Sequence, residues 1–375
     1  MDINRKIKDI SQKIGEQRKN DEMTSYERLM TAFELHQPDR VPVTPFVREC
    51  CLHWIGKKFI DGVMNPELYA YAQLYSIYKL GYDMVLDLSA ITAESEAMGS
   101  VIKFYEDAPP FLETPFIKNY EEDIPRLEML DPHKEKTPQG TPSKLPLLLK
   151  MIKLEKVVCE EHGIPVMAYV QAPSRHASML RGTNLLLSNY SKDPDHVKEL
   201  FDLATESLKI WGEAVIHAGA DILWISDPTG SGDMVSRDVF KKFMHPSLTE
   251  LIRSLKRYNP RAKIFLHICG DVSDRLDLMT RTGIDAISID QKVDISYAKR
   301  VTHDFLGVCL MGNIDPVGIL QQGTSNDVKR EAIRCINKGE QGGGYVLASG
   351  CILPVVSQEN VEAMVKVAKT KGVYC

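Results

Sequence analysis

The first 23 residues, MDINRKIKDISQKIGEQRKNDEM, lack the continuous apolar stretch that a signal peptide or a membrane span requires. Charged residues alternate there with isolated apolar ones. We therefore expect a cytoplasmic protein with no membrane partner.

Positive charge is not concentrated anywhere in the sequence. The chain has 46 Lys and Arg residues against 51 Asp and Glu residues, a net charge of −5, and its basic residues are spread along its length. This distribution lacks the electrostatic footprint of a nucleic-acid-binding protein. Small molecules or other proteins are therefore the expected partners.

Cysteine is also sparse, because eight in 375 residues are too few for a disulfide framework. We expect reduced thiols, some of which are free to serve as ligands. The length, with 43% hydrophobic and 26% charged residues, suits either one barrel with additions or two domains.

The pattern of apolar residues favours a single domain. We interpret residues 1–23 as a polar extension of helical character and residues 24–375 as one barrel domain. The domain opens with a helix that has a capping box at Thr24 and Glu27 and stops before Pro38. One face of this helix is expected to carry Tyr26, Leu29, Met30 and Phe33.

Beyond this helix, short apolar runs alternate with longer segments of helical period, which is typical of parallel strands joined by crossover helices. Eight such runs predict an α/β fold, a closed (β/α)8 TIM-type barrel. Residues 107–143, rich in Pro, Glu and Lys, read as an excursion between barrel units. The predicted strands are 41–46, 84–88, 165–170, 222–225, 263–268, 286–289, 307–311 and 345–348.

The last helix is predicted to open at Ser357 and to end near Gly372. Its apolar residues recur at i, i+3, i+4 and i+7, which indicates one buried face. These residues are Val361, Met364, Val365 and Ala368.

Polar residues follow the C-terminal ends of several predicted strands, the rim on which a (β/α)8 barrel places its chemistry. Asp87 ends the second strand and is our candidate catalytic carboxylate, although such a residue also binds substrate cations, orients a metal ligand or caps a helix. Asp227 has the same ambiguity, since Asp-Pro is a turn signal. The other rim candidates are Arg48, Gln171, Asn313 and Asp315.

The strand FLHIC ends in a pair of metal-ligand side chains. His267 and Cys269 lie two residues apart, so strand alternation points both to one side while Ile268 points away. Cys351 follows another apolar strand, in GGGYVLASGC, and is the best third candidate. Two thiolates and one imidazole favour zinc, and three protein ligands leave one tetrahedral position open for catalysis. On spacing alone, however, a buried cysteine is more often a small apolar side chain.

Several segments together resemble the uroporphyrinogen decarboxylase superfamily over about residues 24–372. Within it, the His-x-Cys pair and the distal Cys resemble the methyltransferase branch, which includes the methylcobamide:coenzyme M methyltransferases of methanogens. A decarboxylase of this superfamily carries an arginine-rich RQAGR-type motif after the first strand, whereas PFVRECCLHW here retains only Arg48 as a cation. The segments are DRVPVTPF, YDMVLDLSAITAESEAMG, GADILWISDPTGSGDMVS, HICGD, MGNIDP and GGGYVLASGC with PVVSQENVEAMV.

The resemblance implies a barrel with Zn²⁺ held by His267, Cys269 and Cys351, and a methyl transfer from a methylcobamide. Zinc would deprotonate an incoming thiol, whose sulfur attacks the methyl carbon while the Co(I) corrinoid leaves. The chain shows no Asp-x-His-x-x-Gly cobalamin motif, so a separate corrinoid protein is the expected partner. The residues expected to face substrate or corrinoid are Arg48, Gln171, Arg175, Asp227, Asn313 and Asp315, with His176 and Arg181 beside Arg175.

Three alternatives stay open from the sequence. The chain is compatible with a related methyltransferase that takes a methyl group from an ether or amine, or that uses tetrahydrofolate as acceptor. A decarboxylase that needs no metal and a non-catalytic corrinoid-binding barrel are the other two. The sequence leaves open the methyl donor and acceptor, the half-reaction, the cognate corrinoid protein, the fourth zinc ligand and homodimer formation.

Overall fold

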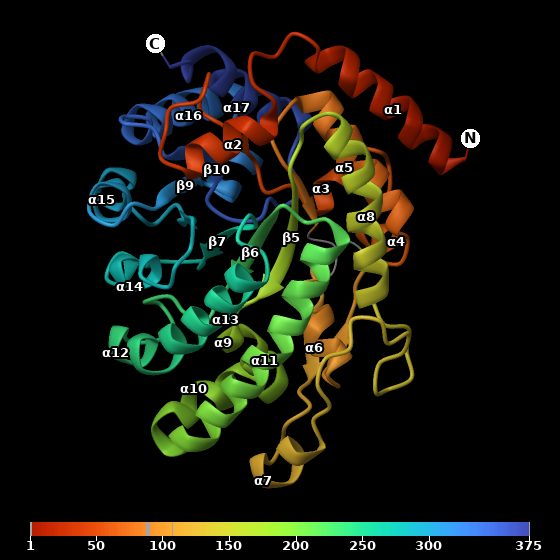
Figure 1. The fold of residues 1–375 in the computed structure, drawn as a ribbon, viewed down its shortest axis with the longest axis vertical. Coiled ribbons are helices and arrows are strands. Elements are labelled where there is room, and N and C mark those ends of the chain that lie inside the picture. The colour runs from red at the N-terminus through yellow and green to blue at the C-terminus, as the bar shows by residue number, and fades with distance from the viewer. Residues whose placement is uncertain (1, 88–90, 107, 375) are drawn as a thin grey trace.

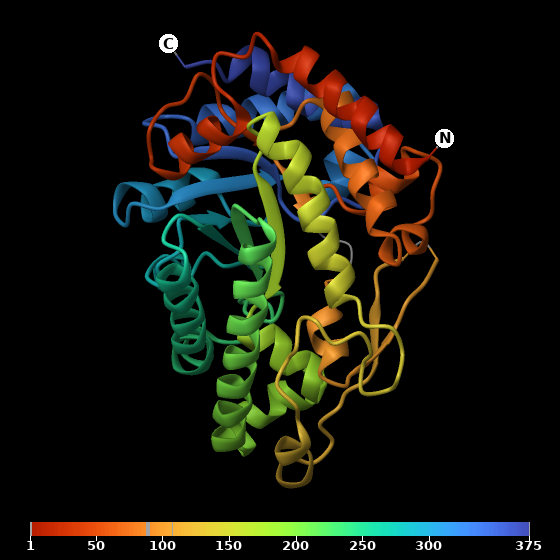
Figure 2. The same ribbon diagram turned by 45° about the vertical axis from the view of Figure 1, so that its right-hand side comes forward.

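A computed structural model shows eight parallel strands wrapped into a barrel, with helices around the outside (Figures 1 and 2). It describes residues 2–87, 91–106 and 108–374, and the backbone alone for Glu49 and Asp87. The strand order is β1-β10-β9-β8-β7-β6-β5-β2. The strands are β1 (Val43–Thr44), β2 (Val85–Asp87), β5 (Val166–Gln171), β6 (Ile222–Ser226), β7 (Lys263–His267), β8 (Ala286–Ser288), β9 (Cys309–Ile314) and β10 (Tyr345–Ser349).

All eight strands fall within the predicted runs or overlap them, and the (β/α)8 TIM-type fold is confirmed. The strands read as continuous apolar runs because both faces of a parallel sheet are covered. Aromatic side chains fill the inside of the barrel: Phe46, just after β1, Trp224 of β6 and Phe265 of β7 are fully buried, with 4.4 Å between the ring centroids of Phe46 and Trp224.

The helices form the outer layer and the ends of the barrel. The longer ones are α1 (Ile3–Arg18), α2 (Ser25–Phe33), α5 (Pro66–Leu80), α8 (Leu145–Glu161), α9 (Pro173–Arg181), α10 (Thr183–Lys192), α11 (Pro194–Ala218), α13 (His245–Tyr258), α16 (Ser325–Gly339) and α17 (Gln358–Lys371). The short ones are α3 (Glu49–His53), α4 (Phe59–Val63), α6 (Ala93–Ala97), α7 (Tyr120–Asp123), η1 (Ile124–Arg126), α12 (Arg237–Val239), η2 (Phe240–Met244), α14 (Leu276–Thr280), α15 (Ile295–Lys299), η3 (Arg300–Asp304) and η4 (Pro316–Gln321).

The first and last helices of the barrel domain begin where predicted. Thr24 and Glu27 form the capping box of α2, and Ser357 caps α17, whose four predicted apolar residues are all buried. The predicted face of α2 was wrong at one position, because Tyr26 is exposed and Arg28 is buried in its place. Arg28 tolerates burial because its guanidinium pairs with two carboxylates.

The N-terminal extension is a helix that packs on the barrel domain. In α1, Ile7, Ile10 and Ile14 are buried, and the spacing of three and four residues places them on one face. This face packs against α5. Burial of the three isoleucines holds this otherwise polar segment on the barrel domain.

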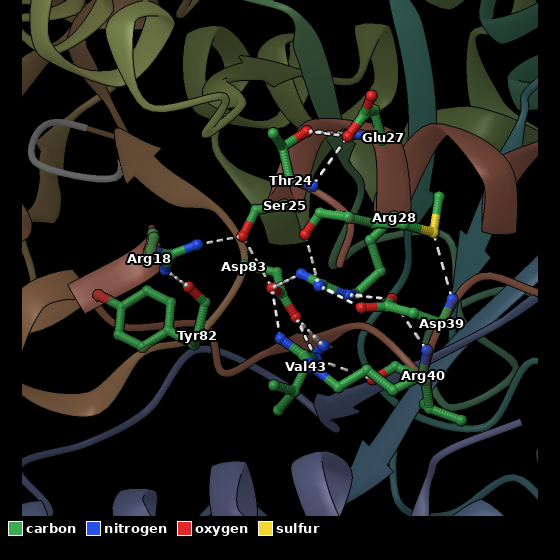
Figure 3. A network of polar contacts seen from close by, with 12 residues as sticks. Arg18, Thr24, Ser25, Glu27, Arg28, Asp39, Arg40, Val43, Tyr82 and Asp83 are labelled. Carbon is green, nitrogen blue, oxygen red and sulfur yellow. Dashed lines mark hydrogen bonds and ion pairs between the residues drawn. The ribbon is translucent and has the colours of Figure 1, made fainter. Parts of the chain in front are cut away.

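A buried charge cluster bridges the seam between β1 and β2 (Figure 3). The Asp83 N–H donates to the carbonyl of Val43 at 2.9 Å, and the Asp83 carboxylate accepts from the Val43 N–H at 2.8 Å. Arg28 and Arg40 hold the same carboxylate at 2.9 and 2.8 Å. Although burial alone would raise the pKa of Asp83, Arg40 and Arg28 hold it well below its usual range.

A two-stranded antiparallel hairpin, β3 (Val101–Lys103) with β4 (Phe111–Thr114), was not predicted. Part of it falls in the segment read as an excursion without regular structure, because strands this short give almost no periodic signal. The chain beyond the hairpin reaches α7, at the opposite end of the molecule from α1 and α2 (Figure 1).

Candidate metal centre

His267, Cys269 and Cys351 meet at the C-terminal rim of the barrel. The Nε2 of His267 lies 3.2 Å from the Sγ of Cys269, which lies 3.4 Å from the Sγ of Cys351. The three ligand atoms all lie within 4.8 Å of one another. Ligand atoms of a tetrahedral zinc site with Zn–S bonds of about 2.3 Å are separated by roughly 3.8 Å. The donor types and their spacing therefore fit zinc.

The strands position the three ligands. His267 is the last residue of β7, and Cys269 follows it by two residues, so both side chains lie on one side while Ile268 is fully buried on the other. Cys351 follows β10 by two residues and is held by Ser349, whose hydroxyl donates to the Cys351 carbonyl at 2.7 Å. The same hydroxyl accepts from the Phe46 N–H at 3.1 Å.

The imidazole of His267 is oriented by Ser288, at the end of the neighbouring strand β8. The Nδ1 of His267 lies 3.1 Å from the Ser288 hydroxyl and 3.3 Å from its carbonyl oxygen. A carbonyl only accepts, so the proton belongs on Nδ1 and the lone pair of Nε2 faces the two sulfurs. This is the second partner that metal-binding imidazoles require, and the sequence interpretation did not name it. The only signal for this role in the sequence was that Ser288, a polar residue, ends the apolar run that forms β8.

A hydrogen bond joins the sulfurs of Cys269 and Cys351. Donation from the Cys269 S–H, with His267 adding to the effect, lowers the pKa of Cys351 well below the usual thiol range. The same hydrogen bond, together with burial, raises the pKa of Cys269. A thiolate is the form that binds a metal ion, so the lowered pKa favours Cys351 as a metal ligand.

The Asp290 carboxylate fixes the segment that follows Cys269. The Gly270 N–H donates to Asp290 at 2.9 Å, and the Asn313 amide donates to the carbonyls of Asp290 and Val293 at 2.9 and 2.8 Å. Asn313, predicted to face the substrate, thus holds the loop that supports a metal ligand. Gly270 has φ of 93° and an added Cβ would lie 2.5 Å from Asp233, so glycine is required there.

Other predicted residues make local contacts at the rim. The buried Asp227 carboxylate accepts from the Ser174 hydroxyl and from the Thr229 N–H at 3.1 Å, and burial raises its pKa. Asp315 caps η4 by accepting from the N–H groups of Val317 and Gly318. Asp87 ends β2, and its side chain lies outside the described part of the protein.

Gln171 belongs to a buried network that joins β5 to the segment after β2. Its side-chain oxygen accepts from the Ser95 hydroxyl and from the Nδ1 of His176, both at 2.9 Å. Its amide donates to the carbonyl of Ile91 at 2.9 Å. Burial lowers the pKa of His176 to about 3, so this imidazole is neutral.

The family described as Uroporphyrinogen decarboxylase (URO-D) matches residues 24–371. The chain belongs to the uroporphyrinogen decarboxylase family.

Within the uroporphyrinogen decarboxylase family, relatives of two kinds align over most of the chain. A methylcobamide:CoM methyltransferase of Methanosarcina mazei is 28% identical over 357 residues, which cover 93% of this chain and 98% of its own. A uroporphyrinogen decarboxylase of Prochlorococcus marinus is 30% identical over 312 residues, 81% of this chain and 84% of its own. The resemblance to the methyltransferase branch is thereby confirmed.

A solved structure agrees with the fold. The methyltransferase from Methanosarcina mazei superposes with a TM-score of 0.80 at 26% identity, covering 93% of this chain and 99% of that chain. Among the residues that the structure describes, no helix is long and apolar enough to cross a bilayer.

Proposed function

We propose that this chain is a zinc-dependent methyltransferase that moves a methyl group between a corrinoid and an acceptor thiol such as coenzyme M. The observation that carries the proposal is the convergence of one imidazole and two sulfurs at the rim of the barrel. The names of relatives that align over nearly the whole chain support the corrinoid and the acceptor.

Zinc bound by His267, Cys269 and Cys351 would keep one tetrahedral position free and lower the pKa of a thiol bound there into the neutral range. The residues around it serve this chemistry. Ser288 fixes the imidazole, and Asp290 fixes the loop that follows Cys269. The rings of Trp224 and Phe46 lie 5.5 and 6.2 Å from that of His267 and exclude water from the inner side.

In this proposal the corrinoid reaches the rim on a separate cytoplasmic corrinoid protein. Asp87, at the end of β2, is proposed as a catalytic carboxylate at the same rim. Gln171, Asp227, Asn313 and Asp315 shape the rim through the contacts described above. These assignments follow from their position at or just beyond the C-terminal ends of the barrel strands.

The segment after the first strand gives less support to the alternative that this chain is a decarboxylase. The segment after β1 carries Arg48 as a single cation, and its guanidinium lies 5.8 Å from the centre of the Phe59 ring. A substrate with several carboxylates needs more than one such group. Retained porphyrinogen turnover after removal of the metal would favour this reading.

The proposal is tested by incubating the zinc-loaded protein with methylcobalamin and, separately, coenzyme M, homocysteine and tetrahydrofolate while recording the corrinoid spectrum. We expect demethylation with coenzyme M and loss of it after chelation. Demethylation with tetrahydrofolate alone would move the acceptor from thiol to folate. An inert corrinoid with all three acceptors would contradict the thiol assignment and point to the donor half-reaction or to a binding-only barrel.

A further inference from the structure

Arg175 is a cation at the rim that forms no ion pair with any residue the structure describes. It lies in α9, directly after β5, and is partly buried. Its Nε is buried and has no hydrogen-bond partner among the described residues. None of the ion pairs found between described residues involves it, and an unsatisfied buried donor is costly.

Three buried arginines, Arg28, Arg40 and Arg275, differ from Arg175 because their guanidinium groups have partners within the fold. Arg28 and Arg40 share the Asp83 carboxylate, and Arg275 donates to the carbonyls of Gly230 and Val235 at 2.8 and 3.0 Å. Their roles are structural, since each completes a network within the fold. Arg175 completes none within the described chain, so its partner is sought outside it.

A pocket of about 320 Å³ opens beside Arg175. The hairpin forms one wall through Pro110, Phe111 and Leu112, and Met179, Thr183 and Asn184 form the other. Thr183 and Asn184 are the first two residues of α10, a ten-residue helix that lacks a side-chain cap at this end. Its first N–H groups therefore add donors to the positive charge of Arg175.

The segment that carries Arg175 is joined to the strand that ends in the metal ligand His267. Ser174, which precedes Arg175, donates its hydroxyl to the Asp227 carboxylate, and the Asp227 N–H donates to the His267 carbonyl at 2.9 Å. The strand register also aligns Gln171, the last residue of β5, with Ser226, and Ser226 with His267. Arg175 therefore follows the β5 end of the same rim that holds the ligand cluster.

We propose that Arg175 binds the anionic end of the acceptor, whose thiol binds at the metal centre, and so selects short thiols that carry a sulfonate or carboxylate. This inference rests on the proposed function. The planar guanidinium suits such oxyanions because it donates two parallel hydrogen bonds. The apolar hairpin wall, with Phe111 and Leu112, covers the carbon chain between the two ends.

The test compares 2-mercaptoethanesulfonate with neutral 2-mercaptoethanol in the zinc-loaded wild type, Arg175→Met and Arg175→Lys. Binding is measured by calorimetry and turnover with methylcobalamin. Arg126→Met is the matched control, because Arg126 is 72% exposed and pairs with Asp123 on the excursion, away from the ligand cluster. We expect Arg175→Met to weaken binding of the sulfonate about 10- to 100-fold, the range for loss of a charged hydrogen bond.

The same variant is expected to leave binding of 2-mercaptoethanol and the KM for methylcobalamin unchanged. Arg175→Lys should recover part of the discrimination, because the charge remains and the paired donors are lost. Equal weakening of both thiols, a raised KM for methylcobalamin with intact discrimination, or a wild type that binds both thiols equally would each overturn the inference.

Failure of the proposed function gives a different result. If methylcobalamin stays intact while wild type still prefers the sulfonate and Arg175→Met does not, methyl transfer to thiols is excluded and the anion site stands.

Discussion

The Nδ1 of His267 lies 3.1 Å from the hydroxyl of Ser288, and the strand register pairs these two residues across β7 and β8. Because the Ser288 carbonyl beside it only accepts, the proton of the imidazole belongs on Nδ1, and Nε2 is left for a metal ion. Ser288→Ala should therefore lower zinc affinity by about 10-fold, the low end for such partners, because the Ser288 carbonyl still accepts at 3.3 Å. Competition with a chromogenic chelator measures this, with Ser288→Thr as the control that keeps the hydroxyl. An unchanged affinity in Ser288→Ala would remove this role.

Cys351→Ala is expected to reduce bound zinc and demethylation together while leaving the fold intact. The barrel is held by its own core, so a catalytic metal site adds little to the folded state. Metal analysis and circular dichroism check the two effects. Cys159→Ala, in the buried face of α8, is the matched control and should keep full zinc content. Unfolding of Cys351→Ala on loss of zinc would show that the metal is structural.

The charge cluster around Asp83 should be the most sensitive site for stability. Asp83→Asn leaves Arg28 and Arg40 buried without their shared carboxylate and is expected to cost about 3–5 kcal/mol in the free energy of unfolding. Urea denaturation measures it. The control Glu106→Gln removes an exposed pair with Lys58 and should cost at most about 1 kcal/mol. Equal costs for the two variants would show that the buried cluster adds no special stability.

Acid should destabilise the protein through His176. Its pKa is about 3 in the folded protein and about 6.5 when unfolded, so the unfolded state takes up the proton first. The associated stability is complete above pH 6.5 and is lost as the pH falls from there toward 3, by about 1.4 kcal/mol per unit.

Chemical denaturation of His176→Gln checks this effect. Between pH 7 and 5 the variant should lose about 2 kcal/mol less than wild type, which follows from the same slope. His133→Gln, an exposed residue of the excursion, serves as the control. Parallel stability curves for wild type and His176→Gln would contradict the assignment.

The sequence predicted the barrel and the His267–Cys269 pair because both depend on local pattern, whereas Cys351, 82 residues further on, was added from its place after another strand and from the family resemblance. Apolar runs marked the eight strands, and two-residue spacing at the end of β7 placed His267 and Cys269 together. Ser288 and Asp290 escaped notice because their roles arise from pairing between strands, which a single sequence does not display. Tyr26 was placed on the buried face of α2, where Arg28 lies instead, for the same reason, because Arg28 is held by Asp83, 55 residues away.

The two charged centres of the molecule lie at opposite ends of the strands. The Asp83 cluster joins the N-terminal ends of β1 and β2, whereas the ligand cluster follows the C-terminal ends of β7 and β10. Substitutions in the rim loops therefore leave the stabilising end untouched. To exchange one reaction for another on this scaffold, the loops after the C-terminal ends of the strands can therefore be replaced. The N-terminal end, with the Asp83 cluster, should be kept unchanged.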